Sequence, residues 1–184
     1  MGVALVVILI VVVLLVLIVV SSYNGLIRLK NRVDSAWAQI DVQLKRRLDL
    51  IPNLVETVKG YAAHEKNTLE AVVAARNVGL AASGPKDQAA ADNLITGALR
   101  QLFALSEAYP DLKANQNFLA LQEELTATED KVAYARQFYN DGVQRFNTKI
   151  ATFPTVIFAR LLKYGAREYF QAEEAAHEAP KVQF

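Results

Sequence analysis

The chain has 184 residues and a formal net charge of +1, so no overall field favours nucleic acid as a partner. It contains no cysteine, which excludes disulfides, thiolate catalysis and cysteine-based metal sites. Five prolines and eight glycines are too few for a disordered chain or a turn-rich β protein. The length leaves room for a membrane anchor and one modest domain.

Residues 3–20 form an unbroken apolar run, VALVVILIVVVLLVLIVV. As a helix this run is about 27 Å long, which roughly matches the ~30 Å hydrocarbon core of a bilayer. No Lys or Arg precedes it, as a cleaved signal peptide would require. We therefore predict a single-pass transmembrane anchor over residues 1–22. The cations that follow the run predict that the N-terminus lies outside and the C-terminal domain in the cytoplasm.

Apolar residues then recur every three or four positions from residue 23 to residue 62, the pattern of one long amphipathic helix. Pro52 falls inside this stripe. The stripe keeps its phase across the proline, and Ile51 cannot cap a new helix, so we expect a kink and not an end. The stripe residues expected to pack between helices or between protomers are Trp37, Leu44, Leu48, Ile51 and Leu54.

Two shorter helices are predicted over about 64–82 and 88–108, separated by a turn at 83–87 in which Asp87 can cap the second. A long helix over about 115–152 follows, and its stripe includes Tyr139 and Phe146, which we also expect to pack between helices or protomers. No stretch alternates as a strand would. The sequence thus predicts an all-α protein in which residues 23–170 form a coiled-coil-like antiparallel four-helix bundle. Residues 171–184 form an acidic tail.

Residues 154–170 mix apolar and basic side chains, which is typical of a segment that lies in a membrane interface. The alternative, which we favour at this point, is that the segment packs on the bundle or on a neighbouring protomer. The cations that would meet lipid headgroups are Arg28, Lys30, Arg32, Arg160, Lys163 and Arg167.

No catalytic or metal-binding set emerges from the sequence. His64-Glu65 lacks the second histidine of a zinc-protease helix, since residue 68 is Thr and the other histidine, His177, lies in the tail. There is no glycine-rich phosphate loop and no serine nucleophile elbow. We expect no enzymatic activity, no cofactor and no metal, unless several protomers combine residues such as His64 and Glu65.

Two polar patterns along the helices are expected to be structural. Lys45, Arg46 and Arg47 point in directions about 100° apart, so we expect solvated side chains paired with Asp41 and Asp49. The pairs Tyr139-Asn140 and Phe146-Asn147 lie one heptad apart. We expect these asparagines to fix the register by hydrogen bonds across helices.

Long stretches of the chain resemble the LemA family of bacterial membrane proteins. They include YNGLIRLKNRVDSAWAQIDVQLKRRLDLIPNLVETVKGYAAHE, YPDLKANQNFLALQEELTATE and AYARQFYNDGVQRFN. The resemblance covers residues 23–184 and implies one N-terminal span, a four-helix domain and no established enzymatic activity. The chain departs from the family near its end, where Tyr164-Gly165 stands in place of a usual Gly-Phe pair.

The expected function is a non-enzymatic, LemA-like scaffold or adaptor in the bacterial inner membrane. Its partners would be the lipid bilayer, further copies of the chain and possible envelope proteins, but not nucleic acid. The apolar run lacks a Gly-x-x-x-Gly motif, so self-association should involve the cytoplasmic helices. The alternative is a lipid-binding or membrane-remodelling module that acts through the basic segments.

Overall fold

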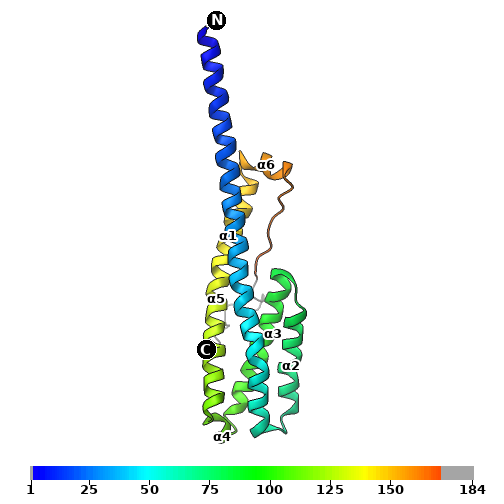
Figure 1. Cartoon of the computed structure of the whole chain (residues 1–184). Coiled ribbons are helices and arrows are strands. Elements are labelled where there is room, and N and C mark those ends of the chain that lie inside the picture. Colours follow the sequence, from blue (N-terminus) through cyan, green and yellow to red (C-terminus); the bar gives the residue numbers. More distant parts are fainter. Residues whose placement is uncertain (1, 171–184) are drawn as a thin grey trace, which may run out of the picture. The chain divides into compact units, whose positions relative to one another are not determined.

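The computed structural model describes residues 2–170, and every regular element in that range is a helix (Figure 1). In chain order these are α1 (Gly2–Ala62), α2 (Lys66–Ala81), α3 (Gly84–Ser106), α4 (Pro110–Lys113), α5 (Gln116–Ala151) and α6 (Thr155–Leu161). The predicted all-α class is confirmed. The predicted acidic tail lies outside the described residues.

The apolar run and the first amphipathic stripe belong to the same helix, because α1 continues from Gly2 through Pro52 to Ala62. The third helix was expected to begin near residue 88, but α3 begins at Gly84. Pro85 stands in its first turn, where the missing amide proton costs nothing and the fixed φ suits a helix. The short helix α4 was not predicted, since four residues are too few to show a periodicity.

The chain divides into two compact units, each of which draws on both long helices. The anchor unit consists of residues 1–37 and 138–168, and therefore contains the apolar run and α6. The bundle unit consists, within the described range, of residues 38–137 together with Tyr169 and Phe170.

The bundle unit packs α2 and α3 against the parts of α1 and α5 that belong to it (Figure 1). Its core cluster is mostly aliphatic, with the fully buried ring of Phe118, and Phe170 of the same unit is also fully buried. A Cβ atom at Gly79 on α2 would come within 2.8 Å of the Leu48 side chain and 3.1 Å of the Ile95 side chain. The absence of a side chain at this position therefore brings α2 close to its neighbours.

In the anchor unit, α1 and α5 run antiparallel and approach closely at glycines. A Cβ atom at Gly142 on α5 would lie 3.4 Å from Val33 Cγ2, and one at Gly25 on α1 would lie 4.0 Å from Lys149 Cε. The rings of Trp37 and Tyr139 pack with their centroids 5.6 Å apart. These three contacts fix one register along the pair of helices.

Packing on α1 begins abruptly after the apolar run. Val20 is 49% exposed, whereas Ser22 is 8% exposed and Leu26 is fully buried. All of residues 3–20 are exposed, and this part of α1 is long and apolar enough to cross a membrane. A helix with an apolar surface on every side needs an apolar environment, so residues 3–20 are a candidate membrane anchor.

Candidate membrane-interface site

The short helix α6 has one packed face and one bare apolar face. Thr155 and Ala159, one turn apart, are buried. Ile157 and Leu161, also one turn apart, are 55% and 78% exposed. Residues two positions apart on a helix point in directions about 200° apart. The exposed pair therefore points away from the packed pair. Phe153, just before the helix, is also exposed.

The register of the anchor unit places α6 near the end of the apolar run. Gly142 lies opposite Val33 and Lys149 opposite Gly25, so each step forward along α5 is a step back along α1. Extended to the end of α5, this register sets Ala151 opposite about residue 24. Figure 1 shows α6 at the level where α1 leaves its apolar segment. The bare face of α6 therefore lies near the boundary at which a membrane would end.

Side chains of α5 hold the chain that follows α6 through a ring contact and hydrogen bonds. The Phe146 ring meets the Tyr164 ring edge-on, with centroids 6.2 Å apart. Asn147 donates to the Arg167 carbonyl at 3.0 Å and accepts from the Arg167 amide at 2.8 Å. The expectation that Asn147 bonds across helices is therefore wrong, because its side chain pairs with the Arg167 backbone, which lies outside any helix and offers both a donor and an acceptor. Lys163, two residues after the end of α6, has a positive φ of 54°, which lies in the left-handed region that glycine adopts more easily.

Tyr139 adds a further tie, since its hydroxyl donates to the Glu168 carbonyl at 2.8 Å. Burial raises the pKa of the Tyr139 phenol above its usual value of 10.0, although the nearby Arg167 works against this. The phenol therefore remains a donor throughout the physiological pH range. Together with the Asn147 pair, this bond holds the chain that carries α6.

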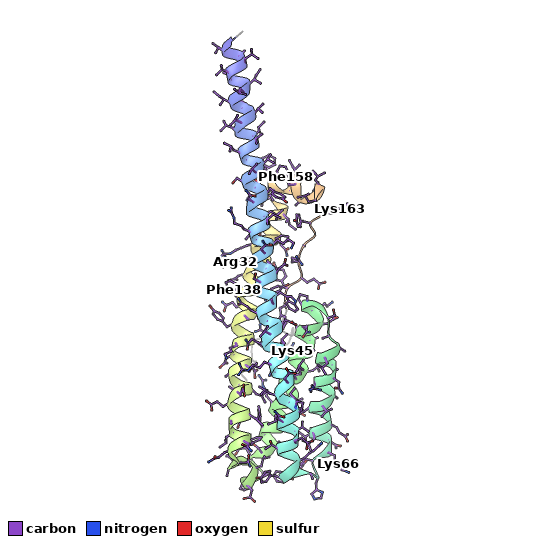
Figure 2. The ribbon with its side chains drawn as sticks, viewed as in Figure 1. Arg32, Lys45, Lys66, Phe138, Phe158 and Lys163 are labelled. Atoms are coloured by element: carbon purple, nitrogen blue, oxygen red, sulfur yellow. The ribbon has the colours of Figure 1, made fainter. Side chains whose placement is uncertain are left out.

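The six predicted interface cations fall into two groups. Lys30 and Arg167 both pair with Asp34, at 2.8 and 2.9 Å. Arg32 lies over the Phe138 ring at 4.9 Å, as Figure 2 shows. These three side chains hold the anchor unit together and are only partly available to lipid. Arg28, Arg160 and Lys163 are exposed and enter no ion pair within residues 2–170.

Charge is distributed unevenly between the two units. The anchor unit carries eight Lys and Arg against three Asp and Glu, a net charge of +5. The described residues of the bundle unit, 38–137, 169 and 170, carry eleven Lys and Arg against thirteen Asp and Glu, a net charge of −2. The near-neutral total therefore conceals a basic unit around the apolar run, and a basic surface is attracted to anionic lipid.

The prediction for the basic triplet is wrong for Arg47, which is not solvated. Its side chain is 1% exposed, and it donates to Asp92 of α3 at 2.6 Å and to Glu129 of α5 at 3.3 Å. Arg46 pairs with Glu124 and not with Asp49. The physical reason is that a buried guanidinium must be paired. α3 offers the mostly buried Asp92 carboxylate, and α5 offers Glu129, whose side chain is 45% exposed. Lys45 is exposed (Figure 2).

Burial raises the pKa of the Asp92 carboxyl above its usual value of 3.8, and the Arg47 charge opposes this effect. Glu129 adds to the rise, and Arg136 opposes it. The ion group formed by Arg47, Asp92 and Glu129 therefore links α1, α3 and α5 within the bundle unit. Arg47 Nε is buried and makes no hydrogen bond within the described part of the chain.

The His64-Glu65 pair lies at the start of α2. Glu65 occupies the N-cap position, and its carboxylate accepts a hydrogen bond from the Tyr109 hydroxyl at 2.9 Å. This bond is the main reason that the pKa of Tyr109 is raised. Among residues 2–170 no group of three His, Cys, Asp or Glu side chains could hold a metal ion.

The residues predicted to pack between helices or protomers are mostly interior. Leu44, Leu48, Ile51, Leu54, Tyr139 and Phe146 are buried, and Trp37 is partly buried. Their apolar surface is therefore already covered within a single chain. Any contact between copies needs a different surface.

Such a surface exists on the bundle unit as an apolar groove of about 670 Å³, which the sequence analysis missed. Four residues of α1 and four of α5 line it: Ala38, Gln39, Val42, Gln43, Asp130, Lys131, Tyr134 and Ala135. Val42 is 61% exposed and Tyr134 is 76% exposed. The signal in the sequence was Val42, an apolar residue one turn from Ala38 and outside the main stripe.

Known proteins are similar to this chain over most of its length. The LemA family model matches residues 36–184. Protein LemA of Metamycoplasma hominis is 31% identical over 159 residues, which cover 84% of this chain and 71% of the relative. Magnetosome protein MamQ 2 of Paramagnetospirillum magneticum is 24% identical, over 87% of this chain and 68% of the relative. Magnetosome protein MamQ of Magnetospirillum gryphiswaldense is 23% identical over the same shares.

Proposed function

This chain belongs to the LemA family, and on that premise we propose that it is a non-enzymatic, membrane-anchored helical scaffold. We place it in the bacterial inner membrane, held by residues 3–20 and by a second contact through α6. The observation that carries this proposal is the bare apolar face of α6 beside Arg160 and Lys163, in the basic unit that also contains the anchor.

The physical argument is the match between α6 and a lipid interface. Ile157 and Leu161 would leave water for the boundary between headgroups and acyl chains, and burial of such a side chain gains about 1.5–3 kcal/mol. Arg160 and Lys163 would meet anionic headgroups, at about 1 kcal/mol each. In Figure 2 Phe158 lies toward the α1 end of this segment and Lys163 at its outer end. Two anchoring points would fix the domain on the membrane surface, as a scaffold requires.

A single nitroxide at Leu161→Cys tests this contact, because the chain has no cysteine of its own. With the full chain in vesicles that contain anionic lipid, we expect the label to be accessible to oxygen and shielded from a water-soluble nickel chelate. The matched control is Leu80→Cys, an exposed leucine on α2, which should show the opposite accessibility. Equal nickel accessibility at both positions would show that α6 does not enter the membrane.

The same Leu80→Cys variant reports the side of the membrane. In intact cells, a membrane-impermeant thiol reagent should leave it unlabelled until the cells are opened. Labelling before lysis would place the bundle unit outside the cytoplasm and contradict the proposed orientation.

The groove between α1 and α5 supports self-association as part of the scaffold role, with a second copy of the chain as its occupant. Asp130 and Lys131 are neighbours of opposite charge on the groove wall. Copies anchored in one bilayer run in the same direction, so a two-fold axis would bring each Asp130 near the Lys131 of the other copy.

Light scattering on the detergent-extracted chain tests the groove. We expect a mass above that of one chain, and we expect Tyr134→Arg to weaken association at least about tenfold, because two guanidinium groups would meet at the axis. The control is Leu119→Arg, which alters an exposed leucine of α5 outside the groove and should leave the mass unchanged. A monomeric wild-type mass would refute self-association but would leave the α6 contact untouched.

A further inference from the structure

A second hollow, in the anchor unit, has the chemistry of an anion site. It measures about 340 Å³ and is lined by Leu29 of α1 and by Gln144, Arg145, Thr148, Lys149 and Thr152. Gln144 and Thr148, and likewise Arg145 and Lys149, are four residues apart on one face of α5, and Thr152 follows directly after the helix ends. We propose that this hollow binds the phosphate of an anionic phospholipid headgroup, an inference that rests on the proposed membrane location.

The lining suits a phosphate group. Arg145 and Lys149 supply two positive charges, and neither forms an ion pair within residues 2–170. Thr148 supplies a hydroxyl donor and Gln144 an amide, whereas the Thr152 hydroxyl donates to the Lys149 carbonyl at 3.3 Å. Charged donors to phosphate oxygens make hydrogen bonds about twice as strong as neutral ones. None of these residues has another role in the core, since Phe146 and Val143 provide the buried face of the same turns.

Gly25 of α1 lies beside Lys149, one of the residues that line the hollow. A Cβ atom at this position would lie 4.0 Å from Lys149 Cε, so the lysine stem lies over a part of α1 that carries no side chain. Leu29, one turn later on α1, provides the apolar wall. A cavity with an apolar wall and a few convergent polar groups is the usual form of a small-ligand site.

The depth of the hollow favours a lipid headgroup over a phosphate in bulk solution. By the antiparallel register, Thr152 lies opposite about residue 23, which is about 5 Å beyond Val20 along α1. Leu29 lies about 13 Å beyond Val20. The headgroup layer on each side of a bilayer is about 5–8 Å thick. The Thr152 end of the hollow therefore coincides with this layer, and the Arg145 end, opposite about residue 30, lies about 15 Å beyond Val20 on its aqueous side.

The test uses the full chain in zwitterionic detergent micelles and titration calorimetry with a short-chain phosphatidylglycerol as the probe. We expect saturable binding, and we expect Lys149→Gln and Arg145→Gln each to weaken it at least about tenfold, since each variant loses a charged hydrogen bond to the phosphate. The control is Lys45→Gln, an exposed lysine of α1 in the bundle unit that lines neither hollow, which should bind as the wild type does.

Inorganic phosphate provides the second arm of the experiment. We expect it to bind far more weakly than the lipid, because it lacks the glycerol and acyl carbons that Leu29 would contact. Equal affinity for the two would show a free-anion site and would overturn the lipid assignment. Unchanged lipid binding in Lys149→Gln would overturn the site itself. Leu161→Asp removes the α6 contact but should retain saturable lipid binding, so a failure of one proposal can be told from a failure of the other.

Discussion

Replacing Arg47 with alanine is expected to lower the free energy of unfolding by about 3–5 kcal/mol, because it leaves a buried carboxylate without its partner. Arg47 is 1% exposed and its Nη1 atom lies 2.6 Å from Asp92 Oδ1. The loss would be measured by chemical unfolding of the full chain in detergent, followed by far-UV circular dichroism. The result bears on function, since the same ion group joins α1, α3 and α5 in the bundle unit.

Arg46, the residue before Arg47, provides a matched control. Arg46 pairs with Glu124 at the surface, where both side chains are about half exposed. Arg46→Ala should therefore cost no more than about 1 kcal/mol, the usual limit for an exposed ion pair. Equal losses for the two alanine variants would mean that the burial of Arg47 has no energetic consequence and would contradict the prediction.

The Asp92 carboxyl makes the stability contributed by the Arg47, Asp92 and Glu129 ion group depend on pH. Because burial raises its pKa above 3.8 in the folded chain, the folded state binds a proton more tightly than the unfolded state does. Stability contributed by Asp92 therefore falls as the pH rises from about 4 through the raised pKa. Arg47 limits this fall, so Arg47→Ala should steepen it, and Asp92→Asn should abolish it. An unchanged pH profile in Asp92→Asn would show that another group is responsible.

The burial of Arg47 could have been predicted from spacing. It lies three residues after Leu44 and four before Ile51, which places it on the apolar stripe of α1. Asp92 stands three residues before the buried Ile95, and Glu129 four after the buried Leu125. Opposite charges on the core-facing stripes of three helices indicate a buried ion group. What spacing cannot supply is which helices meet, because that depends on tertiary packing.

The region around α6 shows a different limit of the sequence. Two alternatives were open for residues 154–170, membrane interface or packing on the bundle. The structure places Thr155 and Ala159 in a packed face and Ile157 and Leu161 in an exposed one. A helix of seven residues shows barely two turns of periodicity, too few to assign its faces. The long stripes of α1 and α5 continue for many turns, and there the pattern was sufficient.

Replacing Phe146 with alanine is expected to lower the local stability of the anchor unit by about 3–5 kcal/mol. Phe146 is fully buried and holds the Tyr164 ring edge-on, while its neighbour Asn147 holds the Arg167 backbone. Loss of the ring leaves a cavity under the chain that follows α6. We therefore expect the Arg167 amide, which donates to Asn147 Oδ1, to lose its protection in hydrogen exchange. The contact of α6 with the membrane should weaken at the same time.

Phe118→Ala separates this local effect from a general loss of packing. Phe118 is equally buried, but it lies in the bundle unit, where its ring meets Phe103 edge-on. The same substitution there should cost a similar free energy and expose amides of α3 and α5, yet leave the Arg167 amide and the Leu161 spin label as in the wild type. If Phe118→Ala also released Arg167, the two units would unfold as one. The position of α6 would then depend on the whole chain, and the ties from Phe146, Asn147 and Tyr139 would not be what fixes its bare face at the membrane boundary.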